Sequence, residues 1–151
     1  MTPEAFSAML RSLPARVDDA GVETMHTEVG NIFRAAQEQN FTRAADHNNT
    51  PWPPRKRSYP WPILRKTRRM LKAASQRNAP GNIQRNIGRT LELGIQNSAV
   101  PYAKFHQFGT SRLPTRRFFY LRQEDRKQLE PAIRAHLMRI MSAARGQFGG
   151  R

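Results

Sequence analysis

The sequence predicts an α+β fold with N-terminal helices, a small antiparallel β-sheet with a long basic loop, and a C-terminal helix. Apolar residues recur at helical spacing over residues 22–36, alternate with polar residues over 90–96, and recur at helical spacing again over 123–145. The 151 residues suit one domain, predicted over residues 1–145. We divide it into three parts. Residues 1–46 form a helical part, residues 47–62 form a Pro-rich basic loop, and residues 63–145 contain a helix, the sheet and the C-terminal helix.

Two helices are predicted in the N-terminal part. Thr2 and Pro3 suit a helix start, and Pro14 ends the hydrogen-bond ladder, so the first helix spans about Pro3 to Leu13. Its apolar stripe comprises Phe6, Met9, Leu10 and Leu13. A longer second helix carries apolar residues three and four apart, a spacing that a strand cannot produce: Val22, Met25, Val29, Ile32, Phe33 and Ala36.

The third segment is an extended loop over residues 47–62. Five prolines lie between Pro51 and Pro62 and forbid both helix and central strand. The loop carries both tryptophans of the chain, Trp52 and Trp61. A helix is then predicted from Pro62 to Ala74, with an apolar side formed by Ile63, Leu64, Met70 and Leu71.

The second half predicts a hairpin and a terminal helix. Residues 90–96 alternate as a half-buried strand, which we pair with the Ile83–Ile87 region. A helix over residues 123–145 contains Pro131, which either kinks it or marks its start. Its apolar face comprises Leu129, Ile133, Leu137, Ile140 and Met141. The Gly-rich tail, residues 146–151, is expected to be disordered.

Charge is unevenly distributed along the chain. The formal net charge is +15; residues 1–50 hold four Arg and seven acids, and residues 51–151 hold 22 Lys+Arg and four acids. This asymmetry favours a polyanion or an acidic protein surface as partner. The chain has no cysteine, which excludes disulfides and thiolate chemistry. With no long apolar window and no signal-like start, we expect a soluble, non-membrane protein made in the cytoplasm.

Residues with catalytic chemistry are sparse and scattered. The basic part holds four carboxylates, three of them near one helix start, where they stabilise the helix dipole: Glu92, Glu124, Asp125 and Glu130. The four histidines show no metal-binding spacing, and no Gly-rich phosphate loop is present: His26, His47, His106 and His136. We therefore expect no enzyme activity, no cofactor and no metal.

The best candidate for recognition is the basic, aromatic stretch from Trp52 to Lys72. Cations interleaved with aromatic rings can hold phosphates and stack on bases. The alternative is a solvated basic face whose tryptophans anchor the loop. The candidate partner or DNA contacts are Trp52, Arg55, Lys56, Arg57, Trp61, Arg65, Lys66, Arg68 and Arg69.

Two adjacent motifs carry a family resemblance. Residues 100–110 read VPYAKFHQFGT, and residues 113–121 read LPTRRFFYL. This pair resembles the phage virion morphogenesis, or tail completion, family of tailed phages and Mu-like prophages. Weaker matches occur in order upstream, at residues 30–33, Phe41, Trp52, residues 62–67 and Leu71. Arg117 stands where the family usually has proline, which leaves this turn less fixed.

Physically, the motifs suggest structural roles rather than catalysis. We expect an aromatic cluster of Tyr102, Phe105, His106 and Phe108 on one turn, with Gly109 ending it in a left-handed conformation. His106 is expected to pack and hydrogen-bond, and Arg116 to bind a carboxylate or main-chain carbonyls. The structural motif residues are Tyr102, His106, Phe108, Gly109, Arg116 and Phe118.

The resemblance implies a structural virion protein that forms a homo-oligomeric ring, with a hexamer as one candidate, at the head-tail joint or tail. Its implied partners are other copies of itself and neck, connector, tail-tube or terminator proteins, with phage DNA in the lumen as a further neighbour. The alternative is a basic nucleic-acid-binding accessory protein. A basic toxin or nuclease would need an acid or histidine pair that the sequence does not offer.

Overall fold

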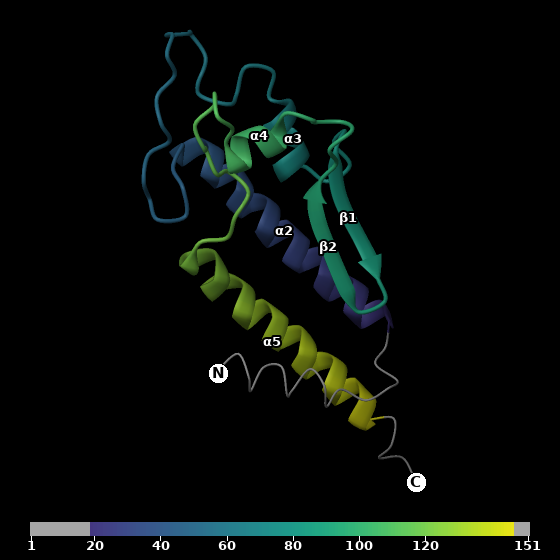
Figure 1. Ribbon diagram of the computed structural model, residues 1–151. Helices are drawn as coiled ribbons and strands as arrows, with labels where there is room; N and C mark the ends of the chain where they lie inside the picture. Colours follow the sequence, from purple (N-terminus) through teal and green to yellow (C-terminus); the bar gives the residue numbers. More distant parts are fainter. Residues whose placement is uncertain (1–18, 147–151) are drawn as a thin grey trace.

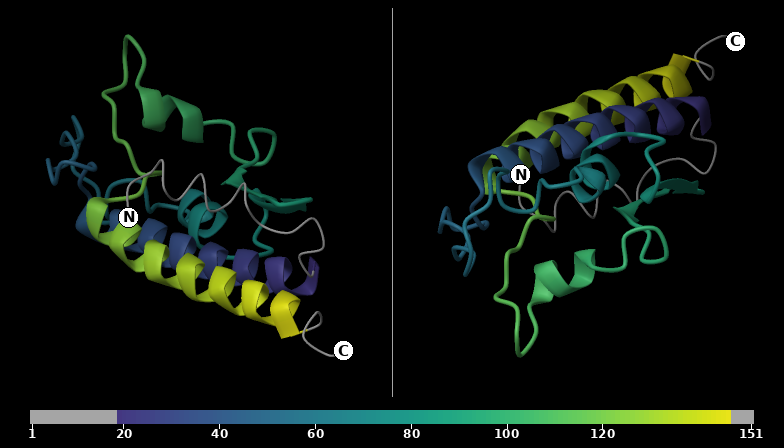
Figure 2. Two further views of the ribbon diagram at one scale, coloured as in Figure 1. Left: turned by 90° about the horizontal axis from the view of Figure 1, so that it is seen from below. Right: turned by 90° about the horizontal axis from the view of Figure 1, so that it is seen from above.

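The computed structural model describes residues 19–146 of the chain. Helix α2 (Asp19–Arg43) and helix α5 (Gln123–Gly146) lie side by side, run in opposite directions and form one layer (Figures 1 and 2). The predicted helix over residues 3–13, and residues 147–151 of the predicted tail, lie outside the described residues.

The remaining elements stack on one side of α2. Helix α3 (Arg69–Ser75) contacts α2, and strands β1 (Asn82–Ile87) and β2 (Thr90–Ile95) form an antiparallel hairpin beside it. Helix α4 (Ala103–Phe108) lies farther out (Figure 2). Helices with a two-stranded antiparallel sheet and a C-terminal helix confirm the predicted α+β class.

The hairpin approaches α2 closely at one glycine. A Cβ atom on Gly30 would lie 2.9 Å from Oε1 of Gln84 on β1, so glycine leaves room for that side chain. Arg34 donates a hydrogen bond to the same oxygen, and His26 pairs with Asn86 at 3.2 Å. Polar contacts therefore hold β1 against α2 between His26 and Arg34.

The main core lies where α2, α3 and α4 converge on the loops between them. Phe41 packs edge-on against Trp52, with ring centroids 5.9 Å apart, and at 5.2 Å from Phe118. Small and apolar side chains complete this core: Met70, Leu71, Ala73, Ala74, Val100 and Ala103. A smaller cluster of Val22 and Ile140 joins the N-terminal end of α2 to the C-terminal part of α5.

Side-chain amides replace a β-ladder for the extended segment before α5. Gln37 both donates to the Tyr120 carbonyl (2.9 Å) and accepts from the Tyr120 N–H (3.1 Å). Asn40 donates to the carbonyls of Phe118 (3.1 Å) and Tyr120 (3.0 Å). From the other side, Gln107 accepts from the N–H groups of Phe118 and Phe119. Because Gln37 and Asn40 are fully buried, these amides satisfy main-chain groups that water cannot reach.

One helix prediction needs correction, and one open alternative is decided. The helix predicted from Pro62 begins only at Arg69, because Leu64 (φ 62°) and Arg68 (φ 56°) adopt left-handed backbone conformations that a helix cannot contain. Pro131 does not mark the start of the C-terminal helix, since α5 continues through it from Gln123. At that start, Asp125 accepts a hydrogen bond from the Arg122 N–H at 2.8 Å, which caps the helix.

Candidate functional site

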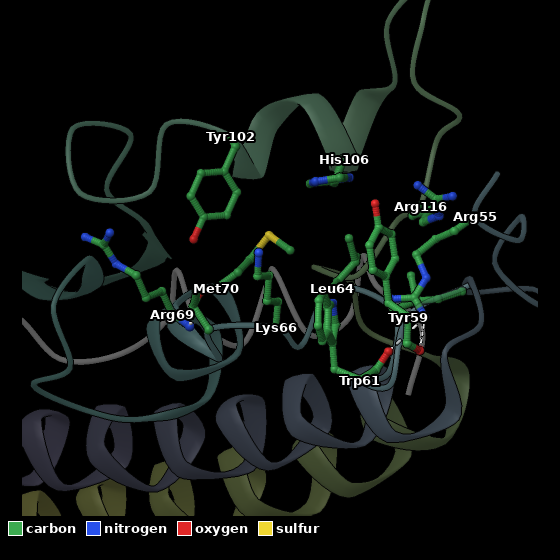
Figure 3. A pocket seen from close by; sticks show the side chains of 12 residues that line it. Arg55, Tyr59, Trp61, Leu64, Lys66, Arg69, Met70, Tyr102, His106 and Arg116 are labelled. Atoms are coloured by element: carbon green, nitrogen blue, oxygen red, sulfur yellow. Dashed lines mark hydrogen bonds between the residues drawn. The ribbon is translucent and has the colours of Figure 1, made fainter. Parts of the chain in front are cut away.

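A cationic, aromatic pocket lies between α4 and the loop that precedes α3. Its volume is about 520 Å3 (Figure 3). It brings together four of the predicted contact residues and three of the predicted motif residues: Arg55, Trp61, Lys66 and Arg69 with Tyr102, His106 and Arg116. Its remaining lining residues are Tyr59, Ile63, Leu64, Thr67 and Met70.

One wall of the pocket is a stack of two rings between two cations. Tyr59 and Trp61 stack with centroids 4.9 Å apart and planes 20° from parallel. The Arg55 guanidinium lies 5.3 Å from the centroid of the Tyr59 ring, and the Lys66 ammonium lies 5.0 Å from that of Trp61. Arg55 also donates to the carbonyls of Tyr59 and Trp61 (Figure 3). This stack orders a stretch that has no helix or strand, through cation–π and stacking interactions.

Arg116 fixes the Pro-rich loop to the rest of the molecule. Its buried guanidinium donates to the carbonyls of Pro53 (2.9 Å) and Pro54 (3.0 Å), and the main-chain N–H of Arg116 donates to the His106 carbonyl (2.7 Å). Burial, followed by the nearby charge of Arg55, lowers the pKa of Arg116. Of the two predicted alternatives for Arg116, a carboxylate or main-chain carbonyls, the structure shows main-chain carbonyls, and they belong to the earlier Pro-rich loop.

His106 projects from α4 into the pocket (Figure 3). Its buried Nδ1 atom has no hydrogen-bond partner in the part of the chain that the structure describes, so the predicted hydrogen-bonding role is not fulfilled there. Burial, and then the charge of Arg116, lower the pKa of His106 below the ordinary histidine value.

The lowered pKa predicts an acid-sensitive contribution to stability. Below the ordinary histidine value of about 6.5, unfolded His106 takes up a proton that the folded state resists, so folding stability falls as the pH decreases through that value towards the folded-state pKa. Chemical denaturation of wild type and His106→Gln across this range measures the effect. The wild type should lose more stability than the variant as the pH falls; equal losses would contradict the assignment.

Trp52, predicted as a partner or DNA contact, is a core residue instead. It is 5% exposed, and its indole N–H donates to the Arg117 carbonyl at 2.8 Å. Its ring packs on Phe41, which leaves no face for an external base. The other predicted contacts do not line the pocket: Lys56, Arg57 and Arg68 are exposed and Arg65 is half-buried.

The predicted aromatic cluster on α4 does not form. Phe108 is 77% exposed and Phe105 is 42% exposed, while Tyr102 and His106 face the pocket on another side. Tyr102, Phe105 and His106 have the i, i+3, i+4 spacing of one helix face, whereas Phe108 follows Tyr102 by six residues and lies on another face. Gly109 does end α4 with a positive φ of 75°, and Phe118 lies in the core. A Cβ at Gly109 would lie 2.5 Å from the Thr115 hydroxyl oxygen, so glycine also provides space for this turn.

The comparison with known protein families gives a match over most of the chain. The model of the phage virion morphogenesis family matches residues 2–138. The chain belongs to the phage virion morphogenesis family. It therefore has a role in phage virion assembly and is a virion-associated protein. No curated protein and no solved structure matches it.

The pocket of this virion morphogenesis protein suits an anion. Four of its lining residues are cationic at neutral pH, and none is acidic. Within residues 19–146, no three His, Asp or Glu side chains gather closely enough to hold a metal ion. The helices of that same part are too short or too polar to cross a membrane.

Sequence reasoning missed the amides that clamp the extended segment of this virion morphogenesis protein. Gln37 and Asn40 lie three residues apart on the α2 face that also carries buried Ala36 and Phe41. Polar residues at buried helical positions need hydrogen-bond partners. Their place on the apolar face of the helix is therefore the sequence signal that could have predicted this role. Gln107, inside the recognised motif, gave no separate signal.

Proposed function

We propose that this virion morphogenesis protein is a non-enzymatic tail-completion subunit that assembles into a ring at the neck or tail end. The observation that carries this proposal is the apolar surface of α4 and the loop after it. Phe108 is 77% exposed, Phe105 42% and Leu113 40%. Figure 2 shows that α4 and this loop stand away from the α2–α5 layer. Exposed apolar surface of this kind is typical of protein contacts.

The proposed occupant of this surface is a second copy of the chain. An apolar groove of about 500 Å3 lies between α4 and the end of β2, lined in part by Ile95, Phe108 and Phe119. Ile87, 61% exposed at the opposite end of the hairpin, offers an apolar projection of matching chemistry. Contact between two different surfaces of identical subunits produces a ring when the rotation closes.

The hairpin supports the same proposal. In the described part of the chain, β1 and β2 pair only with each other. A two-stranded hairpin is marginally stable alone and leaves unpaired strand edges. A neighbouring subunit that pairs with such an edge would stabilise both chains.

A complementation experiment tests the proposed function. Phage particles made without the chain are mixed with purified wild type, Phe108→Glu or the control Ser142→Glu, which adds the same charge on exposed α5 surface. Wild type and the control should restore infectious particles, and Phe108→Glu should reduce the yield by more than about tenfold. Full restoration by Phe108→Glu, or no restoration by wild type, would contradict the proposal.

A nucleic-acid-binding role is the second candidate. It is favoured by the excess of 22 Lys+Arg over four acids in residues 51–151. Binding through phosphates would weaken with salt along a log–log slope of about −0.9 per neutralised phosphate. An apolar ring interface would change much less with salt, so a salt titration separates the two functions.

A further inference from the structure

The lining of the pocket combines an apolar part, the floor, with exposed cationic side chains. Ile63, Leu64 and Met70 form the floor, whereas Lys66 and Arg69, three residues apart in sequence, supply the exposed cations. None of the lining residues is acidic, so none of them neutralises these cations. An occupant that satisfies both parts must carry negative charge beside an apolar group.

The cations of the pocket differ in what they can offer an external ligand. The guanidinium groups of Arg55 and Arg116 already donate to main-chain carbonyls. Lys66 and Arg69 are exposed, and the bond from Arg69 to the Ala99 carbonyl is long, at 3.5 Å. The two side chains with capacity for a new acceptor are therefore Lys66 and Arg69, whose charge-assisted bonds to a carboxylate would be stronger than these contacts.

The aromatic wall argues against a nucleic-acid base as the occupant. Tyr59 and Trp61 stack on each other, Arg55 lies over Tyr59 and Lys66 lies over Trp61. Base recognition by stacking needs a free ring face. A bare phosphate group, in turn, would make no use of the floor formed by Ile63, Leu64 and Met70.

We propose that this pocket binds an acidic peptide segment of a partner virion protein, with an apolar side chain on the floor and flanking carboxylates on Lys66 and Arg69. The proposal rests on the proposed assembly function, because that function supplies a partner protein. It differs from the ring contact in location: the pocket lies on the Tyr102 and His106 side of α4, whereas the groove for a second copy includes Phe108. The two proposals thus place self-assembly and attachment on separate surfaces.

Fluorescence anisotropy of a labelled probe tests this proposal on the full chain. The probe is a blocked peptide of glutamates around a central leucine, compared with its glutamine version and with an oligothymidine of equal charge. Wild type should bind the glutamate peptide more tightly than either comparison probe. Lys66→Gln/Arg69→Gln should weaken that binding about tenfold, whereas the matched control Arg126→Gln/Lys127→Gln on exposed α5 surface should change it less than about twofold.

Three results would overturn the proposal. The first is equal peptide binding by wild type and by Lys66→Gln/Arg69→Gln. The second is a loss of peptide binding in the α5 control as large as that in the pocket variant. The third is tighter binding of the oligothymidine through Lys66 and Arg69, which would make the pocket a nucleic-acid site. Light scattering of the same samples measures the oligomer mass, so it distinguishes a failure of the peptide-binding proposal from a failure of the ring proposal. If the double variant keeps the wild-type oligomer mass but not peptide binding, both proposals are supported; loss of that mass would assign the pocket to self-assembly instead.

Discussion

Replacing Trp52 with alanine should lower the free energy of unfolding by about 3–5 kcal/mol. The indole is 5% exposed, packs edge-on against Phe41, and donates to the Arg117 carbonyl at 2.8 Å. Removal leaves a cavity in the main core and an unpaired carbonyl. Denaturant titration followed by circular dichroism measures the loss.

Trp61→Ala is the matched control for this substitution. Trp61 lies at the pocket wall and makes its ring contacts with Tyr59 and Lys66 on the partly exposed loop. Its removal should cost about 1 kcal/mol or less. Equal effects of the two substitutions would show that Trp52 does not support the core as the structure indicates.

Gln37→Met should destabilise the fold by about 2–4 kcal/mol. The substitution preserves the side-chain length but removes the donor and the acceptor that pair with the main chain of Tyr120. Asn40 still bonds the Tyr120 carbonyl, so the Tyr120 N–H is the group left buried without a partner. Differential scanning calorimetry and denaturant titration both measure this loss.

Gln39→Met provides the comparison on the same helix. Gln39 is exposed, and its side-chain oxygen accepts a hydrogen bond from the Arg43 guanidinium at 3.2 Å. This substitution should change stability by less than about 0.5 kcal/mol. If Gln37→Met were equally mild, the extended segment before α5 would not depend on the amides of α2.

Local periodicity predicted the long elements well. Apolar residues from Val22 to Ala36 form the inner side of α2, and alternation over residues 90–95 matches β2, paired with β1 as expected. Both patterns arise because one side of the element packs against a neighbouring element. Such signals are readable from one sequence because they depend on spacing alone.

Errors arose where a few tertiary contacts overrode local preference. Residues 62–68 have a plausible helical composition, yet left-handed backbone at Leu64 and Arg68 turns this stretch so that Ile63 and Leu64 pack against the core. Trp52 stands among prolines and cations in sequence, but its environment is set by Phe41 and by the Arg117 carbonyl. Neither contact leaves a local pattern.

Individual residues of the pocket could be predicted from the sequence, but their convergence on one pocket could not. Basic and aromatic composition singled out Arg55, Trp61, Lys66 and Arg69, and the family motif singled out His106. Their convergence on one pocket depends on how the Pro-rich loop folds back onto α4, which Arg116 secures through two loop carbonyls. Spacing along the chain contains no information about that approach.

The most direct test of the ring-forming tail-completion role is the solution mass of the purified chain. Light scattering coupled to size exclusion, at low and at high salt, should give one closed oligomer whose mass persists in high salt because its contacts are apolar. A monomer at both salts, at concentrations well above the micromolar range, would contradict the proposed ring.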